Sequence, residues 1–408
     1  MLKKIRALPT EDKVNYFLCF SLIGVSGMPY FFGSIYNTLI FFMISLFIFL
    51  KRSIRFDTRS LNIMGVFFLV ELLQAVFVYS IAPVTYMGTV LRFMFAYVVV
   101  AICNKKFIIY YVNILYFLAV VSFVFYIPTA FIPGVYDFFV STIAPLFPAA
   151  ESSTDNPFYA IQSTIVIFTL HPTILMFRNP GAFWEPGAYA IFLNLALIFN
   201  IIITGKLVNK KNVLFTIAII STLSTTGFVA MFILIASFFL VTGELSKKAF
   251  ILIMFAPLAI YLFFTLDFLG SKISQNMELK DDTTSRFGSA AADLEDFSTS
   301  PLIGWGKGEK RFGGKEFTFF TVDQHRNNGL TNLLATYGIF AFLTLLYNYL
   351  KTFNALCSEY SFTGTFAFLC FLIMMMMGFG ESIFQYPFFF SIMFLHLAYT
   401  KHNSITVR

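Results

Sequence analysis

The chain has 408 residues, of which 58% are hydrophobic and only 12% are charged, with 57 Phe and 20 Tyr. Soluble globular domains carry about 25% charged residues, so this composition excludes a water-soluble fold. A formal net charge of +7 would suggest an anionic partner in a soluble protein, so its distribution along the chain has to be considered first. The composition predicts an all-α polytopic membrane protein.

Membrane-spanning helices are the main predicted elements. A span needs about 20 mostly apolar residues, because lipid offers no hydrogen-bond partner to an unpaired backbone group. Twelve apolar runs of about this kind follow one another along the chain, although the seventh and eighth are short enough to form one broken helix. The runs cover residues 14–31, 34–50, 61–82, 86–103, 107–131, 187–204, 212–225, 227–243, 249–268, 329–350, 364–380 and 384–399.

The basic residues support this count. Eighteen of the 28 Lys and Arg residues lie before the first run or after an even-numbered one. Since cytoplasmic connections collect Lys and Arg, this alternation predicts twelve helices with both termini in the cytoplasm. It also explains the charge of +7 as a topology signal. No small-residue cleavage site follows the first run, so we expect it to be a retained span.

Two connections on the opposite, outer side are long, and they cover residues 132–186 and 269–328 of what we expect to be a single transmembrane domain, 1–408. Loops beyond about 12 to 15 residues are usually functional or disordered. In the second loop, apolar residues recur at helical spacing from Arg286 onward and stop before Pro301. This pattern predicts a short amphipathic helix with Arg286 in its first turn.

Charged residues within the predicted spans are candidates for function. Glu71 lies near the centre of the third span, Arg92 in the outer half of the fourth, and Glu381 near the outer end of the eleventh. Such residues are costly in lipid unless they are paired or hydrated, so each is a functional-site hypothesis. The alternative is an interhelical pair of Glu71 with Arg92 that only fixes helix packing.

Motifs in the outer loops suggest further sites. Glu185 and Pro186 precede the sixth run, where the carboxylate either caps the helix or has a catalytic or sugar-binding role. Trp305 either stacks on a sugar ring or anchors the chain at the membrane interface. The alternate glycines around Trp305 follow no strand and precede no nucleotide-binding helix, which excludes a phosphate loop.

The sequence predicts no metal, no cofactor and no outer disulfide. The nearest paired carboxylates, Asp293 and Glu295, are two residues apart in the predicted helix and so do not face each other. Three of the four cysteines fall in predicted spans, and Cys357 falls in a cytoplasmic connection. We therefore expect any chemistry to be metal-independent.

Taken in order, the outer-loop motifs resemble those of the bacterial O-antigen polymerase (Wzy type) family, whose superfamily includes the O-antigen ligases. The matching features are the twelve spans, the two loops, Arg178 with 181–186, Arg286, the segment 300–306, the polar segment 325–328 and the segment 337–339. One departure is that Arg326 stands between His325 and the asparagines. Either His325 is catalytic, or Asn327 or Asn328 takes its position and binds sugar.

The resemblance implies a GT-C-like glycosyltransferase with two large periplasmic loops in the bacterial inner membrane. It implies that oligosaccharide repeat units on undecaprenyl pyrophosphate are joined at the periplasmic face during lipopolysaccharide biosynthesis. Other expected partners are membrane lipids, a chain-length regulator and a flippase, but no nucleic acid. The candidate residues are Arg178, Arg286 and Arg92 for the pyrophosphate, His325, Glu185 or Asp323 as general base, and Trp305, Asn327, Asn328 and Trp184 for sugars.

Two other functions remain open at this point. An O-antigen ligase, which transfers finished polysaccharide to lipid A core, shares the fold and the arginines, but the long loop after the fifth span and the irregular His motif favour the polymerase. A transporter of lipid-linked sugars is a more distant alternative, because such transporters often show internal repeats and place charge at the bilayer midplane. The sequence shows no clear repeat, and most candidate residues lie outside the spans.

Overall fold

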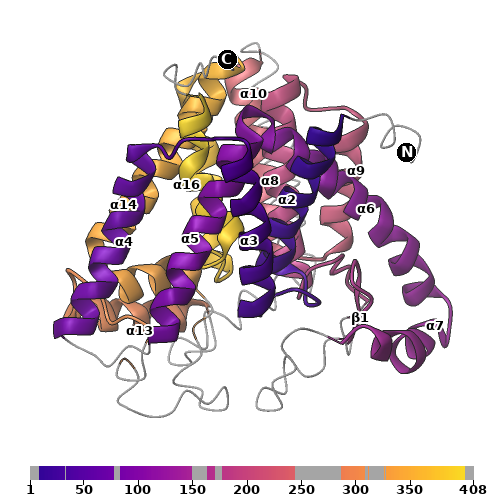
Figure 1. Cartoon of the computed structure of the whole chain (residues 1–408). Helices are drawn as coiled ribbons and strands as arrows, with labels where there is room; N and C mark the ends of the chain where they lie inside the picture. The colour runs from indigo at the N-terminus through magenta and orange to yellow at the C-terminus, as the bar shows by residue number, and fades with distance from the viewer. Residues whose placement is uncertain are drawn as a thin grey trace. The chain divides into compact units, whose positions relative to one another are not determined.

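A computed structural model describes residues 9–32, 34–77, 83–148, 163–170, 177–243, 286–307, 311, 326 and 328–399. These residues form helices almost throughout, with one short two-stranded sheet (Figure 1). The ninth predicted run, residues 249–268, lies outside the described residues. The prediction of an all-α protein is therefore confirmed for the part of the chain that the structure describes.

Eleven of the twelve predicted runs coincide with helices among the described residues, within a few residues except that α14 continues well past the predicted end at residue 350. The helices are α2 Thr10–Gly27, α3 Ile35–Lys51, α4 Thr58–Phe77, α5 Pro83–Cys103, α6 Phe107–Phe131, α8 Pro186–Thr204, α9 Lys210–Ser221, α10 Thr225–Thr242, α14 Gly329–Glu359, α15 Gly364–Gly380 and α16 Pro387–Tyr399. The predicted amphipathic helix is also confirmed, as α13 Arg286–Thr299. The remaining elements are η1 Asn104–Lys106, α7 Val135–Phe138, η2 Phe139–Ile143, η3 Ala144–Leu146 and the antiparallel strands β1 Ser163–Thr164 and β2 Thr169–Leu170.

Among the described residues, five helical segments are long and apolar enough to cross a membrane. They are Thr58–Phe77, Thr85–Phe131, Pro186–Thr204, Thr225–Thr242 and Gly329–Glu359. The second of these has 47 residues and contains α5 and α6 on either side of η1, where Asn104 has a left-handed φ of 51°. The described part of the chain is thus all-α with five candidate membrane-spanning helices, as in a polytopic membrane protein, and the number twelve stays a prediction.

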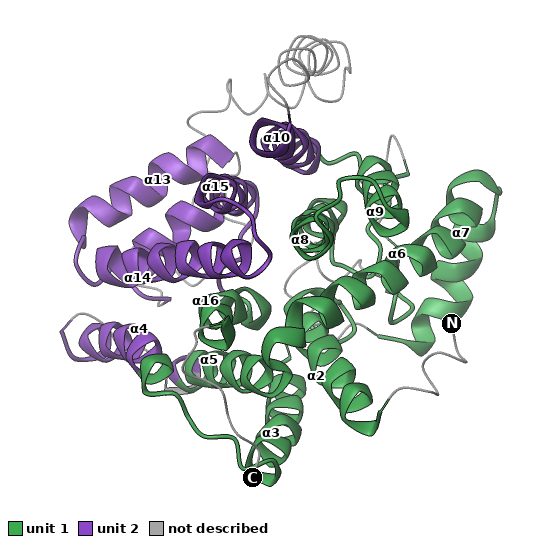
Figure 2. Ribbon diagram, turned by 90° about the horizontal axis from the view of Figure 1, so that it is seen from above, with its two compact units in different colours: residues 1–61, 87–224, 386–408 green, residues 62–86, 225–385 purple. Residues whose placement is uncertain are grey.

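The chain divides into two compact units (Figure 2). The first contains residues 1–61, 87–224 and 386–408, and the second contains residues 62–86 and 225–385. Each unit combines segments that are distant in sequence. The single transmembrane domain expected from the sequence stays a prediction.

In the first unit, α8 forms the centre of the core. Its residues from Pro186 to Ile202 are buried, which suits a helix that is apolar on all sides. α8 packs against α6 and α9, and Phe192 of α8 packs against Phe388 of α16, at 5.3 Å between ring centroids. The buried hydroxyl of Tyr111 donates a hydrogen bond of 2.8 Å to the Phe192 carbonyl, so this polar atom is satisfied.

In the second unit, α14 packs against α15, and α15 packs against α10. The amphipathic helix α13 packs against α14 and lies across one end of it (Figure 1). α13 contains polar residues such as Asp293 and Asp296, which α14 meets near its N-terminal end. The polar groups of this unit therefore gather at one end of its apolar helices.

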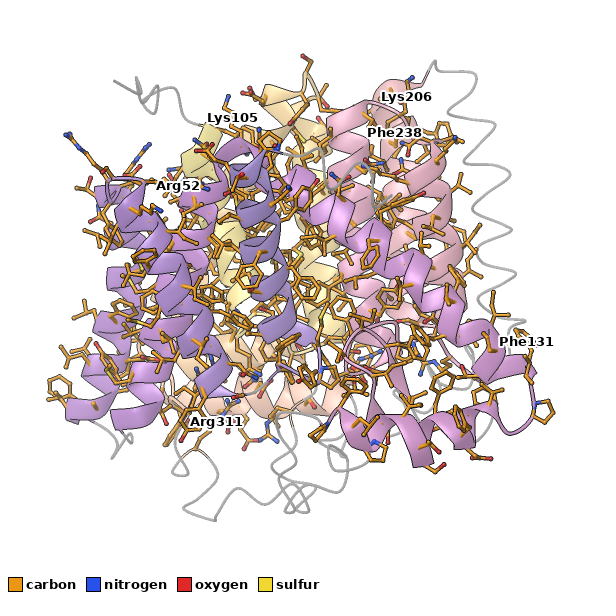
Figure 3. All side chains as sticks on the ribbon, turned by 45° about the vertical axis from the view of Figure 1, so that its right-hand side comes forward. Arg52, Lys105, Phe131, Lys206, Phe238 and Arg311 are labelled. Carbon is orange, nitrogen blue, oxygen red and sulfur yellow. The ribbon has the colours of Figure 1, made fainter. Side chains whose placement is uncertain are left out.

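Many apolar side chains remain exposed on the outer faces of the helices (Figure 3). On α3 they recur as one stripe along the helix, formed by Tyr36, Leu39, Ile40, Met43, Phe47 and Leu50. Soluble proteins rarely expose apolar patches of this extent, whereas lipid covers them at no cost. The exposed stripe is thus typical of a membrane helix.

Candidate functional site

α14 is broken at Gly338. This residue has φ 71° and ψ −177°, a conformation that is essentially restricted to glycine. A break in a membrane helix frees backbone groups that need new partners. Those partners come from the segment 301–306, which follows α13.

Three backbone hydrogen bonds join this segment to the break. The Trp305 N–H donates to the Ala335 carbonyl at 2.8 Å, and the Gly306 N–H donates to the Thr336 carbonyl at 2.9 Å. From the other side of the break, the Ile339 N–H donates to the Pro301 carbonyl at 2.9 Å. We call the joined segments, 301–306 and 335–339, the glycine clasp.

The clasp explains why two positions in the sequence motifs, Gly304 and Gly338, are occupied by glycine. A Cβ atom on Gly304 would lie 2.5 Å from the Thr336 carbonyl oxygen, and a Cβ atom on Gly338 would collide with the Leu302 carbonyl. Gly304 also has a left-handed φ of 69°. Only glycine permits this backbone approach, so the two motifs quoted from the sequence form one contact.

A glutamine on α4, in the N-terminal part of the chain, completes the clasp. The side chain of Gln74 on α4 is fully buried, and its amide nitrogen donates to the carbonyls of Ile303 and Thr336, the latter at 2.7 Å. Nearby, the Tyr337 hydroxyl donates to the carboxylate of Glu71 at 3.3 Å. Glu71 thus belongs to the second unit, whereas Arg92 lies on the part of α5 in the first. Their predicted pairing stays a prediction.

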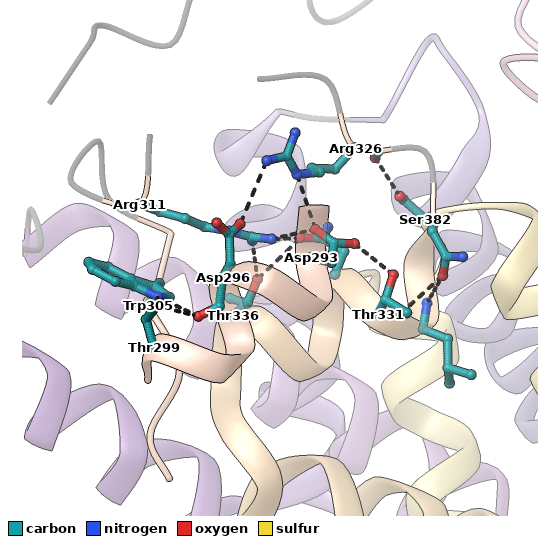
Figure 4. A network of polar contacts seen from close by, with 12 residues as sticks. Asp293, Asp296, Thr299, Trp305, Arg311, Arg326, Thr331, Thr336 and Ser382 are labelled. Carbon is teal, nitrogen blue, oxygen red and sulfur yellow. Dashed lines mark hydrogen bonds and ion pairs between the residues drawn. The ribbon is translucent and has the colours of Figure 1, made fainter. Parts of the chain in front are cut away.

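A buried cluster of charges lies beside the clasp (Figure 4). The guanidinium of Arg311, whose side chain is 3% exposed, lies 2.6 Å from Asp293 and 2.9 Å from Asp296, both on α13. It also donates to side-chain oxygens of Asn332 at 2.8 Å and Thr336 at 3.0 Å on α14. Arg311 therefore joins α13 to α14.

Arg326 is the second arginine of this cluster. Its guanidinium lies 3.2 Å from Asp293 and 3.7 Å from Asp296. Its backbone carbonyl accepts a hydrogen bond of 3.2 Å from Ser382, in the connection after α15. Arg326, which stands between His325 and the asparagines in the sequence, thus fixes the chain to α13 just before α14 begins. We call Asp293, Asp296, Arg311 and Arg326 the charge cluster.

Asp293 is the most perturbed carboxylate in the cluster. Burial raises the pKa of Asp293 from its ordinary value of 3.8 to about 6, while Arg311, Thr331 and Arg326 act in the opposite direction. The Thr331 hydroxyl donates to Asp293 at 2.7 Å. Burial disfavours the ionised carboxylate because it removes hydration, and the two guanidinium groups replace only part of it.

Arg286 lies at the start of α13 and is more accessible than the cluster arginines. Its side chain is 32% exposed, and it forms an ion pair of 3.1 Å with Glu381, whose side chain is 15% exposed. Gly329, the first residue of α14, lies so close to the Glu381 carbonyl that a Cβ atom would collide with it. Arg286, Arg326, Asn328, Glu381 and Ser382 therefore lie where three segments meet, and we call them the polar corner.

Asn328 has an unusual position in the polar corner. Its side-chain oxygen caps α14 by accepting hydrogen bonds of 3.1 Å from the Leu330 and Thr331 N–H groups. Its amide nitrogen is buried and has no acceptor among the residues that the structure describes. This donor needs a partner, since a buried polar group without one is costly.

Trp305 uses its polar atom within the protein. The indole N–H donates to the Asp296 carbonyl at 2.7 Å and to the Thr299 hydroxyl at 2.9 Å, so the side chain closes the C-terminal end of α13. Because the indole N–H is already used, any sugar would have to stack on the face of the ring. This role of Trp305 in sugar binding stays a prediction.

Four predicted site residues, Arg178, Trp184, Arg92 and Glu185, lie in the first unit, before or within its helices. Arg178 donates from Nε to the Thr222 carbonyl at 3.0 Å. The indole ring of Trp184 is largely buried and stacks on Phe32, with 5.1 Å between ring centroids. Arg92 is partly exposed on α5.

Glu185 precedes α8, and Pro186 is the first residue of that helix, as the sequence predicts. The Glu185 side chain is partly exposed and forms no capping hydrogen bond with α8. Its carboxylate thus lies next to a helix N-terminus, where negative charge is favoured, without being used by the helix. The structure describes each unit by itself, so it brings Arg286 and Asn328 together, but leaves Glu185, Arg178 and Arg92 as separate candidates. His325, Asn327 and Asp323 lie outside the described residues.

The sequence did not single out the charge cluster. Asp293 and Glu295 were considered as a pair, but the two carboxylates that act together are Asp293 and Asp296. Residues three apart share one face of a helix, so this spacing was the available signal. The sequence offered no comparable signal for Arg311, because its partners come from distant segments.

Comparison with known proteins adds no identification. The chain matches no protein-family model, and it matches no curated protein. The function therefore has to be argued from the polar corner, the charge cluster and the glycine clasp.

Proposed function

We propose that this protein is a membrane glycosyltransferase of the O-antigen polymerase type. It would join oligosaccharide repeat units carried on undecaprenyl pyrophosphate at the outer face of the bacterial inner membrane. The observation that supports this proposal is the accessible Arg286 guanidinium, which already holds a carboxylate in the polar corner beside Arg326 and Asn328.

The chemistry of the leaving group favours an arginine at this position. Glycosyl transfer from a lipid pyrophosphate breaks the bond between sugar and phosphate and releases the lipid pyrophosphate, which carries negative charge. A guanidinium binds phosphate oxygens in a bidentate, charge-assisted way, which stabilises charge as it develops. The carboxylate of Glu381 lies 3.1 Å from Arg286 and stands in the position of such an anion. The unused amide nitrogen of Asn328 offers one more donor to a phosphate or sugar oxygen.

The acceptor hydroxyl needs a general base within hydrogen-bond reach. Glu185 and His325 remain the candidates, and Arg178 and Arg92 remain candidates for further phosphate contacts. Glu185 is suited to the role because its carboxylate is partly exposed and is not used to cap α8. Transfer in this scheme is metal-independent.

The placement of charge supports an outer-face site. The polar corner lies at the N-terminal end of α14, and Lys351 lies near the other end of this 31-residue helix. The chain between them, on both sides of the break at Gly338, has enough residues at about 1.5 Å each to cross the roughly 30 Å core of a bilayer. Because Lys marks the cytoplasmic side, the polar corner is assigned to the periplasm, together with the twelve-span, GT-C-like topology.

The break in α14 argues against a transporter. In transporters with broken helices, the freed carbonyls coordinate the transported ion. Here Trp305, Gly306 and Gln74 donate to the carbonyls at the break. The polar corner would suit a ligase as well as a polymerase. The two functions are therefore distinguished by the acceptor, which is lipid A core for the ligase and a repeat unit for the polymerase.

Reconstitution of the purified protein in liposomes with lipid-linked repeat units tests the proposal. A ladder of lengthening glycans on a gel is expected for the polymerase. Product formed only when lipid A core is added would show that the protein is a ligase and not a polymerase. Translocation of the lipid-linked units without new glycosidic bonds would contradict the proposal that the protein is an enzyme.

Arg286→Lys tests the proposed phosphate contact. It keeps the charge but removes the bidentate geometry, so chain extension should fall at least about tenfold. The matched control is Arg59→Lys, since Arg59 also pairs with a carboxylate, Asp57, at 2.7 Å, but is 43% exposed and lies in a predicted cytoplasmic connection. Full activity of Arg286→Lys in correctly inserted protein would contradict the proposed role of Arg286.

A further inference from the structure

The helical segment 135–146 follows directly on a candidate membrane span. α6 ends at Phe131, and the chain then turns at Gly134, which has a left-handed φ of 78°. From there α7, η2 and η3 continue as one helical segment of mixed type to Leu146. Figure 1 shows α7 at the lower end of α6, turned away from the axis of that helix.

The inner face of the segment is fixed by packing. Tyr136, Phe139, Val140 and Ile143 pack against a small core that contains Ala144 and the hairpin residues Ile165, Phe168 and Leu170. Phe125 of α6 joins this core, with its ring 5.9 Å from that of Phe139 and 5.6 Å from that of Phe168. These contacts set which side of the segment points outward.

The outer face has two different edges. Phe138 is 52% exposed and Leu146 is 69% exposed, while Asp137 and Ser141 are also exposed. At about 100° per residue, Phe138 and Leu146 lie toward one edge of this face with the exposed Thr142 between them, and Asp137 and Ser141 lie toward the other. The outer face is therefore divided lengthwise into a mainly apolar edge, whose one polar side chain is a threonine, and a polar edge that carries the acidic residue.

The apolar edge continues a stripe on α6. Exposed apolar side chains recur on that helix three and four residues apart, as Phe117, Val120, Val124, Ile127 and Phe131. This spacing is one face of an α-helix, and α6 belongs to a candidate span. The stripe ends with Phe131, which is 74% exposed and lies at the opposite end of α6 from Lys105 (Figure 3).

The dimensions place this end of α6 at a membrane surface. The 25 residues of α6 cover about 38 Å at 1.5 Å per residue, slightly more than the apolar thickness of a bilayer. A helix that begins there and turns away from the span has water on one side and lipid on the other. Its two edges match these two surroundings.

We propose that residues 135–146 form an interfacial helix that lies on the outer surface of the membrane, with Phe138 and Leu146 inserted among the lipid chains. The partner is the bilayer itself. Residues 107–148 contain no Lys or Arg and only one acidic residue, Asp137, so insertion depends on apolar contact and needs no anionic lipid. This inference does not depend on the proposed function.

Depth-dependent quenching tests the proposal. Phe138→Cys, Leu146→Cys and the control Ser141→Cys are labelled with a fluorescent probe and reconstituted in liposomes of neutral lipid. All three positions are exposed, so no substitution removes a buried side chain. The four native cysteines are buried, and wild-type protein gives the labelling background.

Lipids that carry a quencher in the acyl chain should quench the probes at 138 and 146 at least about twofold more than the probe at 141. Aqueous iodide should show the reverse order. Equal iodide quenching at all three positions would overturn the proposal. Protection of 138 and 146 that disappears when the protein is diluted in lipid would also overturn it, because a second copy of the chain would then cover this edge.

Discussion

The backbones of Gly304 and Gly338 touch, so that a Cβ atom on Gly304 would lie 2.6 Å from the Gly338 nitrogen. One glycine follows the amphipathic helix α13, and the other breaks the apolar helix α14. The contact allows a loop outside the span to satisfy the backbone groups that the break exposes. It also holds α13 and its charge cluster at the end of α14.

Gly338→Ala should destabilise the second unit by about 3 kcal/mol or more, because the added Cβ meets the Leu302 carbonyl in a backbone conformation that favours glycine. Thermal unfolding in detergent, followed by tryptophan fluorescence, measures the effect. Gly65→Ala in α4 is the control, since a Cβ there meets nothing within 4 Å and the helix propensity improves. Equal unfolding temperatures for the two variants would show that the clasp does not stabilise the protein.

Arg311→Met should cost about 3 to 5 kcal/mol, since it removes the closer of the two guanidinium groups and leaves Asp293 and Asp296 with Arg326 alone in a buried site. Arg59→Met removes a comparable but exposed ion pair and should cost about 0 to 1 kcal/mol. Chemical unfolding of both variants in the same detergent compares them. If the two costs were alike, the charge cluster would contribute no more than a surface pair.

The raised pKa of Asp293 predicts a pH dependence of stability. The folded protein binds this proton more tightly than the unfolded chain, so the resulting stabilisation is fully present below about pH 4 and is lost as the pH rises through about 6. We expect the unfolding free energy of wild type minus that of Asp293→Asn to decrease between about pH 4 and pH 7. A difference that increases with pH would contradict this prediction.

The protein has two tryptophans, and Trp305 contacts the charge cluster through the Asp296 carbonyl. A Trp184→Phe background therefore makes fluorescence specific for the second unit. Unfolding curves at each pH, with and without Asp293→Asn, give the required difference.

Glu381→Gln should release Arg286 from its carboxylate partner. If Arg286 receives the donor pyrophosphate, the substitution should lower the KM for the lipid-linked donor by up to about tenfold, while kcat changes little. Glu359→Gln, near the other end of α14, is the control. Loss of kcat at unchanged KM would instead assign a direct catalytic role to Glu381.

Several features were predictable because they depend on local pattern. Apolar runs of span length predicted eleven described helices, and the spacing from Arg286 onward predicted α13. Pro186 at the start of α8 followed from its fixed φ, which suits a first helical position. Each of these is determined within one or two helical turns of sequence.

The partners of the polar residues were not predictable in the same way. Asp293 and Glu295 drew attention as neighbours in sequence, yet Asp293 pairs with Arg311 and Arg326, which come from two other places in the chain. Likewise, the glycines near Trp305 were considered only as a phosphate loop, whereas Gly304 is required by the close approach of the backbone at Gly338. The sequence of a single segment does not show which distant segment will pack against its backbone.

The sequence by itself determined that this chain is a membrane protein with apolar helices, because the free energy of placing each segment in lipid depends on its own composition and length. It also determined which residues carry the charge at the outer loops. Only the tertiary structure decided that Gly304 meets Gly338, that Gln74 satisfies the same break, and that Arg326 and Glu381 lie in one polar corner. These contacts depend on packing between distant segments, where hydrogen bonds and close backbone approach select the partners.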